Sequence, residues 1–122
     1  SADGGTRTAS INGAYVAAYI AFLNLIKQEK IEKMPFYDSV AAISIGIVNG
    51  EILVDLDYSE DSTADLDFNF ILTGSQKIIE IQGCAEKTPI EFEVLQKLYD
   101  LSKKTVTKIT ELQNNAISGY IF

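Results

Sequence analysis

Residues 40–57 read Val40-Ala-Ala-Ile-Ser-Ile-Gly-Ile-Val-Asn-Gly-Glu-Ile-Leu-Val-Asp-Leu-Asp57. The first nine are apolar or small and rich in β-branched side chains, which predicts a buried strand over Val40–Val48. The dipeptide Asn49-Gly50 favours a two-residue hairpin turn, because both residues adopt positive φ easily. Apolar side chains then recur at every second position over Glu51–Asp57. This stretch therefore predicts an antiparallel hairpin.

A second hairpin is predicted further along the chain. Large apolar side chains alternate with acidic or amide ones at the start of Leu66–Thr73, which predicts a third strand. Gly74-Ser75 favours a turn, and Lys77–Gln82 reads as a fourth strand. Gly83–Lys87 is predicted to be a loop.

Helical patterns flank the strands. Apolar side chains at three- and four-residue spacings predict a helix over Gly13–Glu29, which Ser10 or Asn12 can cap. A long C-terminal helix is predicted to start with Thr88 as its cap and Pro89 at its first position. The tail over residues 114–122 carries no clear pattern.

The order of these elements predicts the fold class. One helix, four antiparallel strands and one helix indicate an α+β fold. We expect a four-stranded, mainly antiparallel sheet with two long helices packed on it, both on one face of the sheet. The length of 122 residues suits a single domain over residues 1–122.

Composition excludes several kinds of chemistry. The chain has no His, so His-based nucleophilic catalysis and the usual zinc sites are excluded within it. The net charge of −7 argues against nucleic-acid binding by this chain on its own. The single cysteine, Cys84, leans towards a reducing compartment, and we expect it to be a small buried residue. No apolar run reaches the length of a membrane span, and no secretory signal is visible.

The first ten residues predict an anion site. Gly4 and Gly5 stand directly before Arg7, the only arginine in the sequence, and the predicted helix follows. A glycine loop, the positive end of a helix and a guanidinium together suit phosphate. The competing interpretation is a flexible terminus with a solvated arginine.

Acidic residues gather between the second and third strands. Six of the thirteen residues from Asp55 to Asp67 are Asp or Glu. Clustered carboxylates suit Mg²⁺, Mn²⁺ or Ca²⁺, although the spacing does not match an EF-hand. Asp65 and Asp67 stand inside a strand pattern, where Asp is disfavoured. The competing interpretation is a solvated acidic loop.

Four segments in register resemble the ribonuclease PH family of phosphorolytic exoribonucleases. The resemblance runs from Ala2 to about Gln113 and rests on these segments: Asp3-Gly-Gly-Thr-Arg-Thr-Ala-Ser-Ile11, Gly46-Ile-Val-Asn-Gly50, Asp55–Asn69 and Glu80-Ile-Gln-Gly-Cys-Ala-Glu86. Cys84 stands where the family has threonine.

The resemblance implies a function and a set of site residues. It implies 3′→5′ trimming of RNA, including tRNA precursors and rRNA. Inorganic phosphate would be the attacking group, and nucleoside diphosphates would be the products. Gly5, Thr6 and Arg7 match the family's phosphate loop. Asp61 and Asp67 match its catalytic acidic pair, which would hold Mg²⁺ or protonate the leaving oxygen. A cytoplasmic homo-hexamer, a trimer of dimers, is implied, with no membrane partner.

The resemblance also implies a partner within the same protein. This chain corresponds to the family's C-terminal half, and the N-terminal half carries a further phosphate-contacting arginine and much of the RNA-binding surface. We therefore expect this chain alone to be inactive. The alternatives are a non-catalytic ring subunit or fragment of an exosome-type or polynucleotide phosphorylase-type assembly, and a divalent-ion-binding module unrelated to RNA.

Overall fold

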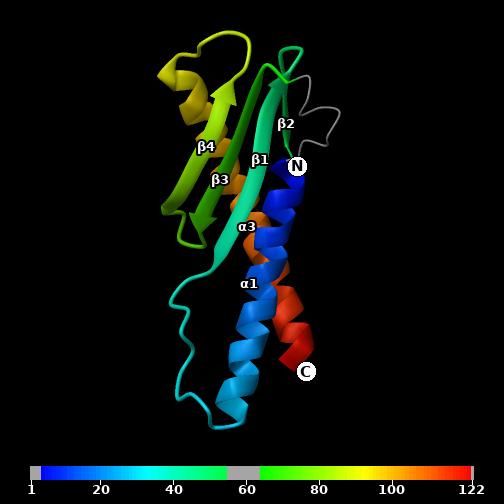
Figure 1. Cartoon of the computed structure of the whole chain (residues 1–122), viewed down its shortest axis with the longest axis vertical. Coiled ribbons are helices and arrows are strands. Elements are labelled where there is room, and N and C mark those ends of the chain that lie inside the picture. Colours follow the sequence, from blue (N-terminus) through cyan, green and yellow to red (C-terminus); the bar gives the residue numbers. More distant parts are fainter. Residues whose placement is uncertain (1–3, 55–63, 122) are drawn as a thin grey trace.

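The structure, a computed structural model, describes residues 4–54 and 64–121. Its elements in chain order are α1 (Gly4–Lys27), β1 (Val40–Val48), β2 (Glu51–Val54), β3 (Leu66–Thr73), β4 (Ile78–Ala85) and α3 (Phe92–Ile121). The strands form one antiparallel sheet in the order β2-β1-β3-β4 (Figure 1). The predicted α+β fold, with a four-stranded sheet and two long helices, is confirmed.

The first hairpin is the one that the sequence predicts. Strand β1 has the predicted bounds, and Val48 pairs with Glu51 across the turn. Asn49 and Gly50 both have positive φ, 51° and 81°, as a type I′ turn requires. Strand β2 is described as far as Val54, and the rest of its predicted range lies outside the described residues.

The second hairpin is longer than predicted. Strand β3 has the predicted bounds, but β4 runs to Ala85, three residues past the predicted end at Gln82. Gly83 is a strand residue facing Phe68, and a Cβ at this position would collide with the Phe68 ring and the Asp67 carbonyl oxygen. A glycine that marks a loop in the sequence is here the residue that lets two strands approach closely.

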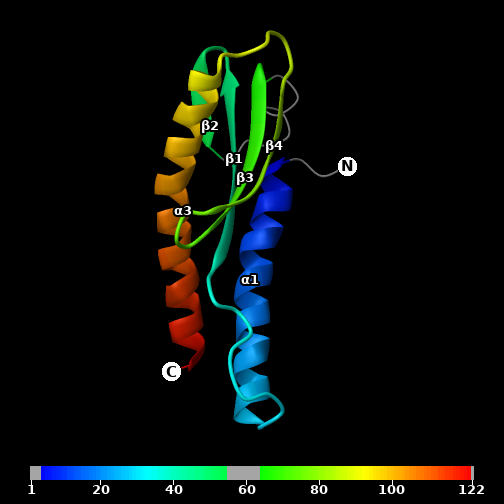
Figure 2. The same ribbon diagram turned by 90° about the vertical axis from the view of Figure 1, so that its left-hand side faces the viewer.

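The two helices lie on opposite sides of the sheet, so the prediction that both cover one face is wrong. Ile43, Ile45 and Phe70 pack with Leu98 of α3 in the main core. The alternate residues of β1 are small, and Ala42 and Ser44 are fully buried on the other side. Figure 2 shows the strands between α3 and the N-terminal part of α1. All residues of β1, on both faces of the sheet, are buried or half-buried, as expected for a strand that is packed on both sides.

Helix α1 begins nine residues before its predicted start. Ser10 does not cap it; its hydroxyl donates to the Thr6 carbonyl oxygen within the helix (2.9 Å). Asn12 does not cap it either, because its side-chain amide bonds to the backbone of Ala42 in β1. Both residues resemble caps in sequence, but one is satisfied locally and the other by a distant strand.

Helix α3 begins four residues after the predicted cap Thr88 and includes most of the unassigned tail. Gln113, which is buried, donates to the carbonyl oxygens of Asn12 (3.3 Å) and Val40 (3.0 Å). Past the end of the sheet, the Tyr120 hydroxyl donates to the Asn24 side chain (2.9 Å). These contacts to α1 and β1 explain why the helix continues where its local pattern fades.

Helix α1 is also apolar along most of its length. By length and composition, residues Gly5–Lys27 could cross a membrane, and 6% of the apolar stretch within them is buried. The prediction that no apolar run reaches the length of a membrane span is therefore wrong. One such helix is weak evidence for a membrane span, because buried core helices of soluble proteins and signal sequences have the same length and composition. In this fold the side chain of Asn12 bonds the first half of α1 to β1, and Thr8 and Tyr15 of the same half are buried.

Candidate functional site

The N-terminus of α1 forms the core of the candidate phosphate site. Gly4 and Gly5 are the first residues of the helix, so the predicted glycine loop is instead the first helical turn. The first four N–H groups of a helix have no acceptor within it, and they lie at the positive end of the helix dipole. Gly5, Thr6 and Arg7, predicted to bind phosphate, all belong to this turn. Both properties of an anion site therefore remain.

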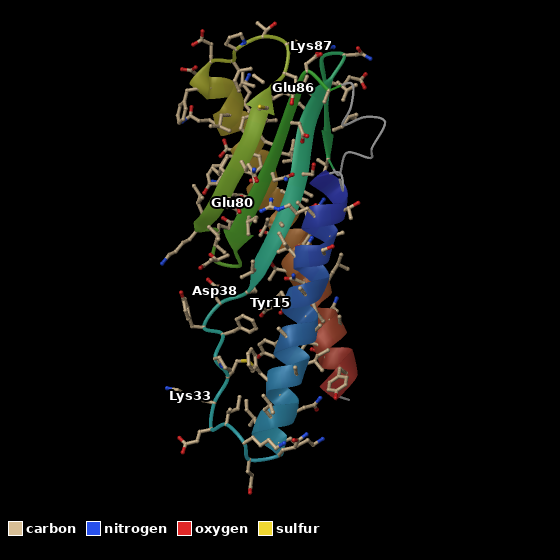
Figure 3. The ribbon with its side chains drawn as sticks, viewed as in Figure 1. Tyr15, Lys33, Asp38, Glu80, Glu86 and Lys87 are labelled. Carbon is tan, nitrogen blue, oxygen red and sulfur yellow. The ribbon has the colours of Figure 1, made fainter. Side chains whose placement is uncertain are left out.

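Arg7 reaches across the sheet to an acidic partner on β4. Its Nη2 atom donates to Oε2 (3.0 Å) and Oε1 (3.2 Å) of Glu80, which lies 73 residues later in the chain. Figure 3 shows Glu80 on the face of the sheet turned towards α1. The side chains are 40% and 38% exposed. The sequence prediction missed Glu80, whose one local signal is an acidic residue within the apolar strand Ile78–Ala85.

The second terminal nitrogen of the Arg7 guanidinium, Nη1, differs from Nη2 in its hydrogen bonding. Arg7 Nη1 is buried and has no hydrogen-bond partner among the residues that the structure describes. A buried donor without an acceptor costs about 1–3 kcal/mol, so such atoms are rare unless something else satisfies them. A phosphate oxygen is an acceptor of the right kind for this atom.

Asp67 lies on the same side of the sheet as Arg7 and Glu80. It sits on β3 between Gly46 of β1 and Cys84 of β4, and it is half-buried. Its neighbour Phe68 packs in the α3 core, so Asp67 points to the α1 side. Glu80 pairs with Ile71, four residues along β3, which is roughly 13 Å at 3.3 Å per residue. The structure thus brings the predicted phosphate turn and one of the two predicted catalytic carboxylates onto one face.

The rest of the acidic cluster is only partly described. Asp61 lies outside the described residues, as do the other acidic residues between 55 and 63. The Asp65 carboxylate pairs with Lys87 Nζ (2.8 Å), which supplies the charge that the cluster hypothesis assigned to a metal ion. Among residues 4–54 and 64–121 there is no group of three or more acidic or cysteine side chains that could hold a metal.

Two polar side chains between Arg7 and Asp67 were missed at the sequence level. Ser44 of β1 and Asn69 of β3 lie opposite each other on the face below α1. Ser44 Oγ and Asn69 Oδ1 are buried and have no hydrogen-bond partner within the described part of the chain. Ser44 has a weak signal, as the one hydroxyl in the apolar run of β1. The floor between the helix turn and Asp67 is therefore polar rather than apolar.

Cys84 is exposed, so the prediction that it is buried is wrong. It lies on β4, an edge strand of the sheet, directly opposite Asp67. An edge strand has a neighbour on one side only, which leaves its side chains more open.

Comparison with known proteins places the fold and its motifs in a family. The model of the 3′ exoribonuclease family, domain 2, matches residues 38–105. Proteins named Ribonuclease PH are 50% identical over 118 residues in Neisseria meningitidis and 46% identical over 112 residues in Tropheryma whipplei. These alignments cover 97% and 92% of this chain but 49% and 45% of the relatives, so the chain spans about half their length.

A solved structure supports the fold independently. Rice Rrp46 superposes with a TM-score of 0.71 at 15% sequence identity, covering 96% of this chain and 50% of that protein. At this identity the likeness shows the fold alone. The family match, together with the resemblance carried by the four motif segments, settles the membership: this chain belongs to the 3′ exoribonuclease family, whose domain 2 it matches.

Proposed function

We propose that this protein is a phosphorolytic 3′→5′ exoribonuclease and that this chain supplies its phosphate-binding residues. In the proposed reaction, an oxygen of inorganic phosphate forms a bond to the phosphorus of the last phosphodiester of an RNA. The bond from that phosphorus to the 3′ oxygen of the preceding nucleotide breaks, and this oxygen takes up a proton. The products are a nucleoside diphosphate and an RNA shortened by one nucleotide. Such transfers depend mainly on positioning and charge stabilisation.

The observation that carries the proposal is the state of Arg7 at the start of α1. Its Nη1 atom is buried without a partner among the described residues, and it belongs to a turn whose backbone N–H groups have no helical acceptor. An attacking phosphate bound there would accept from Nη1 and lie at the positive end of the helix dipole. The positive charge would also offset the repulsion between the phosphate and the RNA backbone.

Asp67 supports the second half of the site. We assign to Asp67, together with Asp61, the part of the reaction that concerns the leaving 3′ oxygen. Carboxylate oxygens suit Mg²⁺, which would stabilise the developing negative charge when bound. Without a bound ion, one of the two carboxyl groups would give the oxygen its proton. Dependence of the rate on the divalent ion separates these two roles.

Substrate and assembly form part of the same proposal. The substrate is RNA with a free 3′ end, with tRNA precursors and rRNA as the expected cases, and the active form is a cytoplasmic ring of three dimers. A net charge of −7 disfavours RNA binding by this chain on its own, so we place the basic surface elsewhere in the protein. The relatives are about twice as long as this chain, so they have room for an N-terminal half. We propose that this half supplies the basic surface.

A second candidate function is a non-catalytic subunit of a phosphorolytic ring. The acidic balance of seventeen acids to ten bases favours this role for the chain taken alone. The two candidates differ in one respect, which is turnover by the complete protein.

The test is an RNA degradation assay with the protein at the length that its own organism makes, beside the 122-residue chain. Phosphate is titrated and the products are separated by chromatography. For the protein at its natural length, the proposal predicts release of nucleoside diphosphates in amounts that rise with the phosphate concentration. For the 122-residue chain it predicts no turnover if the other half is required. Degradation that ignores phosphate would reject the phosphorolytic function, and no degradation at all would favour the non-catalytic subunit.

A further inference from the structure

Glu80 accepts hydrogen bonds from one terminal nitrogen of the Arg7 guanidinium and none from the other. Both of its carboxylate oxygens accept hydrogen bonds from the same nitrogen, Nη2, at 3.0 and 3.2 Å. The opposite nitrogen, Nη1, is buried without an acceptor in the described part of the chain. A bidentate pair of the usual kind would engage two nitrogens of the guanidinium, and this one does not.

The pair is not explained by its contribution to stability. The two side chains are 40% and 38% exposed, and ion pairs this open to water contribute little to folding. It also joins elements that are far apart in the sequence, the first turn of α1 and the strand β4, 73 residues later. Glu80 is anchored there by the pairing of β4 with β3, in which it faces Ile71.

We propose that Glu80 is a positioning residue that fixes the Arg7 guanidinium at the N-terminus of α1 for the attacking phosphate. This inference rests on the proposed phosphorolytic function. An arginine side chain has many rotamers, and ordering it on binding lowers affinity. Glu80 orders it beforehand, through Nη2, and the unpartnered Nη1 is the donor that the phosphate oxygen satisfies.

The opposite role for Glu80 has a different signature. A carboxylate beside an anion site can also compete with the anion for the same arginine. In that case its removal would tighten phosphate binding, whereas removal of a positioning residue weakens it. The sign of the change in the phosphate KM therefore separates the two roles.

The experiment measures phosphate and RNA KM values for the protein at its natural length and for three variants at position 80. Glu80→Ala removes both acceptors, and Glu80→Gln keeps one acceptor oxygen at the same side-chain length. Glu80→Asp keeps the charge but withdraws the carboxylate by one methylene. Glu111→Ala is the control, because it removes the same charge from an exposed residue of α3, on the other side of the sheet.

A positioning role predicts a specific pattern. Glu80→Ala and Glu80→Asp should raise the phosphate KM about tenfold, the scale of one charge-assisted hydrogen bond, with kcat at saturating phosphate and the RNA KM little changed. Glu80→Gln should recover most of the loss, and Glu111→Ala should match the wild type. If the alanine variant does not fold, the aspartate variant carries the same prediction.

Two results would overturn the proposal in distinguishable ways. A wild-type protein with no phosphate-dependent turnover overturns both the proposed function and the role of Glu80. An active wild type whose phosphate KM is unchanged or lowered in Glu80→Ala and Glu80→Asp overturns the positioning role alone.

Discussion

Asn12 of α1 and Ala42 of β1 exchange two hydrogen bonds. The Ala42 N–H donates to Asn12 Oδ1 (2.7 Å), and Asn12 Nδ2 donates to the Ala42 carbonyl oxygen (2.9 Å). As far as strand β2 is described, it pairs with residues 45–48 of β1, and at Ala42 the Asn12 side chain makes the two hydrogen bonds that a neighbouring strand would make. This side chain fixes α1, and with it the Arg7 turn, against the edge of the sheet.

Removing the Asn12 side chain should destabilise the fold. Asn12→Ala leaves two backbone groups of Ala42 without these partners, and we expect a loss of about 2–3 kcal/mol in urea unfolding. Asn12→Asp keeps the acceptor but loses the donor, so its loss should be smaller. Asn115→Ala, at an exposed position of α3, is the control. Equal stability of Asn12→Ala and the control would show that the two hydrogen bonds contribute nothing.

Two glycines should respond in opposite ways to alanine. Gly83→Ala would push a methyl group into Phe68 and the backbone of Asp67, so we expect about 2 kcal/mol of destabilisation. Gly13 lies in α1 with open space around its Cβ position, and Gly13→Ala should stabilise by about 0.5–1 kcal/mol through its helix propensity. Thermal unfolding of both variants measures the difference. Two changes of the same sign would contradict the close approach of β4 to β3.

These two glycines also show what could be predicted from sequence. Asn49-Gly50 and the alternation in β1 and β3 are local signals, and the bounds of both strands follow from them. Gly83 marks a loop in sequence, but only the contact with β3 makes it a strand residue. The start of α1 was misplaced for a similar reason, because Asn12 is satisfied by a strand thirty residues away.

The candidate site divides in the same way. The first-turn residues Gly5, Thr6 and Arg7 could be found from sequence because they are adjacent in the chain. Glu80 could not, since its role depends on a contact across 73 residues, and neither could the facing pair Ser44 and Asn69. The placement of α1 and α3 on opposite sides of the sheet depends on the small residues on one face of β1. The sequence of β1 is apolar or small throughout, so its two faces could not be distinguished from the sequence.

Arg7 variants should affect phosphate more than RNA. Arg7→Ala removes the guanidinium, so we expect the phosphate KM to rise by about tenfold to a hundredfold with the RNA KM little changed. Arg7→Lys keeps the charge but not the planar fork, and its phosphate KM should lie between those of the wild type and the alanine variant. Phosphate titrations of RNA degradation measure these values. An unchanged phosphate KM in Arg7→Ala would reject the helix N-terminus as the phosphate site.

Asp67 should be needed for turnover and not for assembly. Asp67→Asn preserves the shape of the side chain and removes its charge, so we expect phosphorolysis to fall by about a hundredfold or more, the scale of a lost general acid or metal ligand. Size-exclusion chromatography should show the same oligomer as the wild type. Wild-type rates in this variant would end the assignment.

Acid should unfold the protein in part through Asp38. A hydrogen bond from the Ser75 side chain is the main cause that holds the pKa of Asp38 below its ordinary value of 3.8. The unfolded chain therefore binds this proton more readily than the folded one. The stability that Asp38 contributes is present above the ordinary value and is lost as pH falls through the lowered pKa.

Ser75→Ala tests this acid dependence. The variant should lose less stability than the wild type when urea unfolding is followed from neutral pH to below pH 4, because the main cause of the lowered pKa is gone. Identical pH profiles for the two proteins would contradict the role of the hydrogen bond.

The most direct measurement of the central claim follows the phosphorus atom itself. The protein at its natural length is incubated with RNA and radiolabelled inorganic phosphate, beside the Arg7→Ala and Asp67→Asn variants. The account predicts label in the terminal phosphate of released nucleoside diphosphates, strongly reduced in both variants. Release of unlabelled nucleoside monophosphates would show hydrolysis instead and would contradict it.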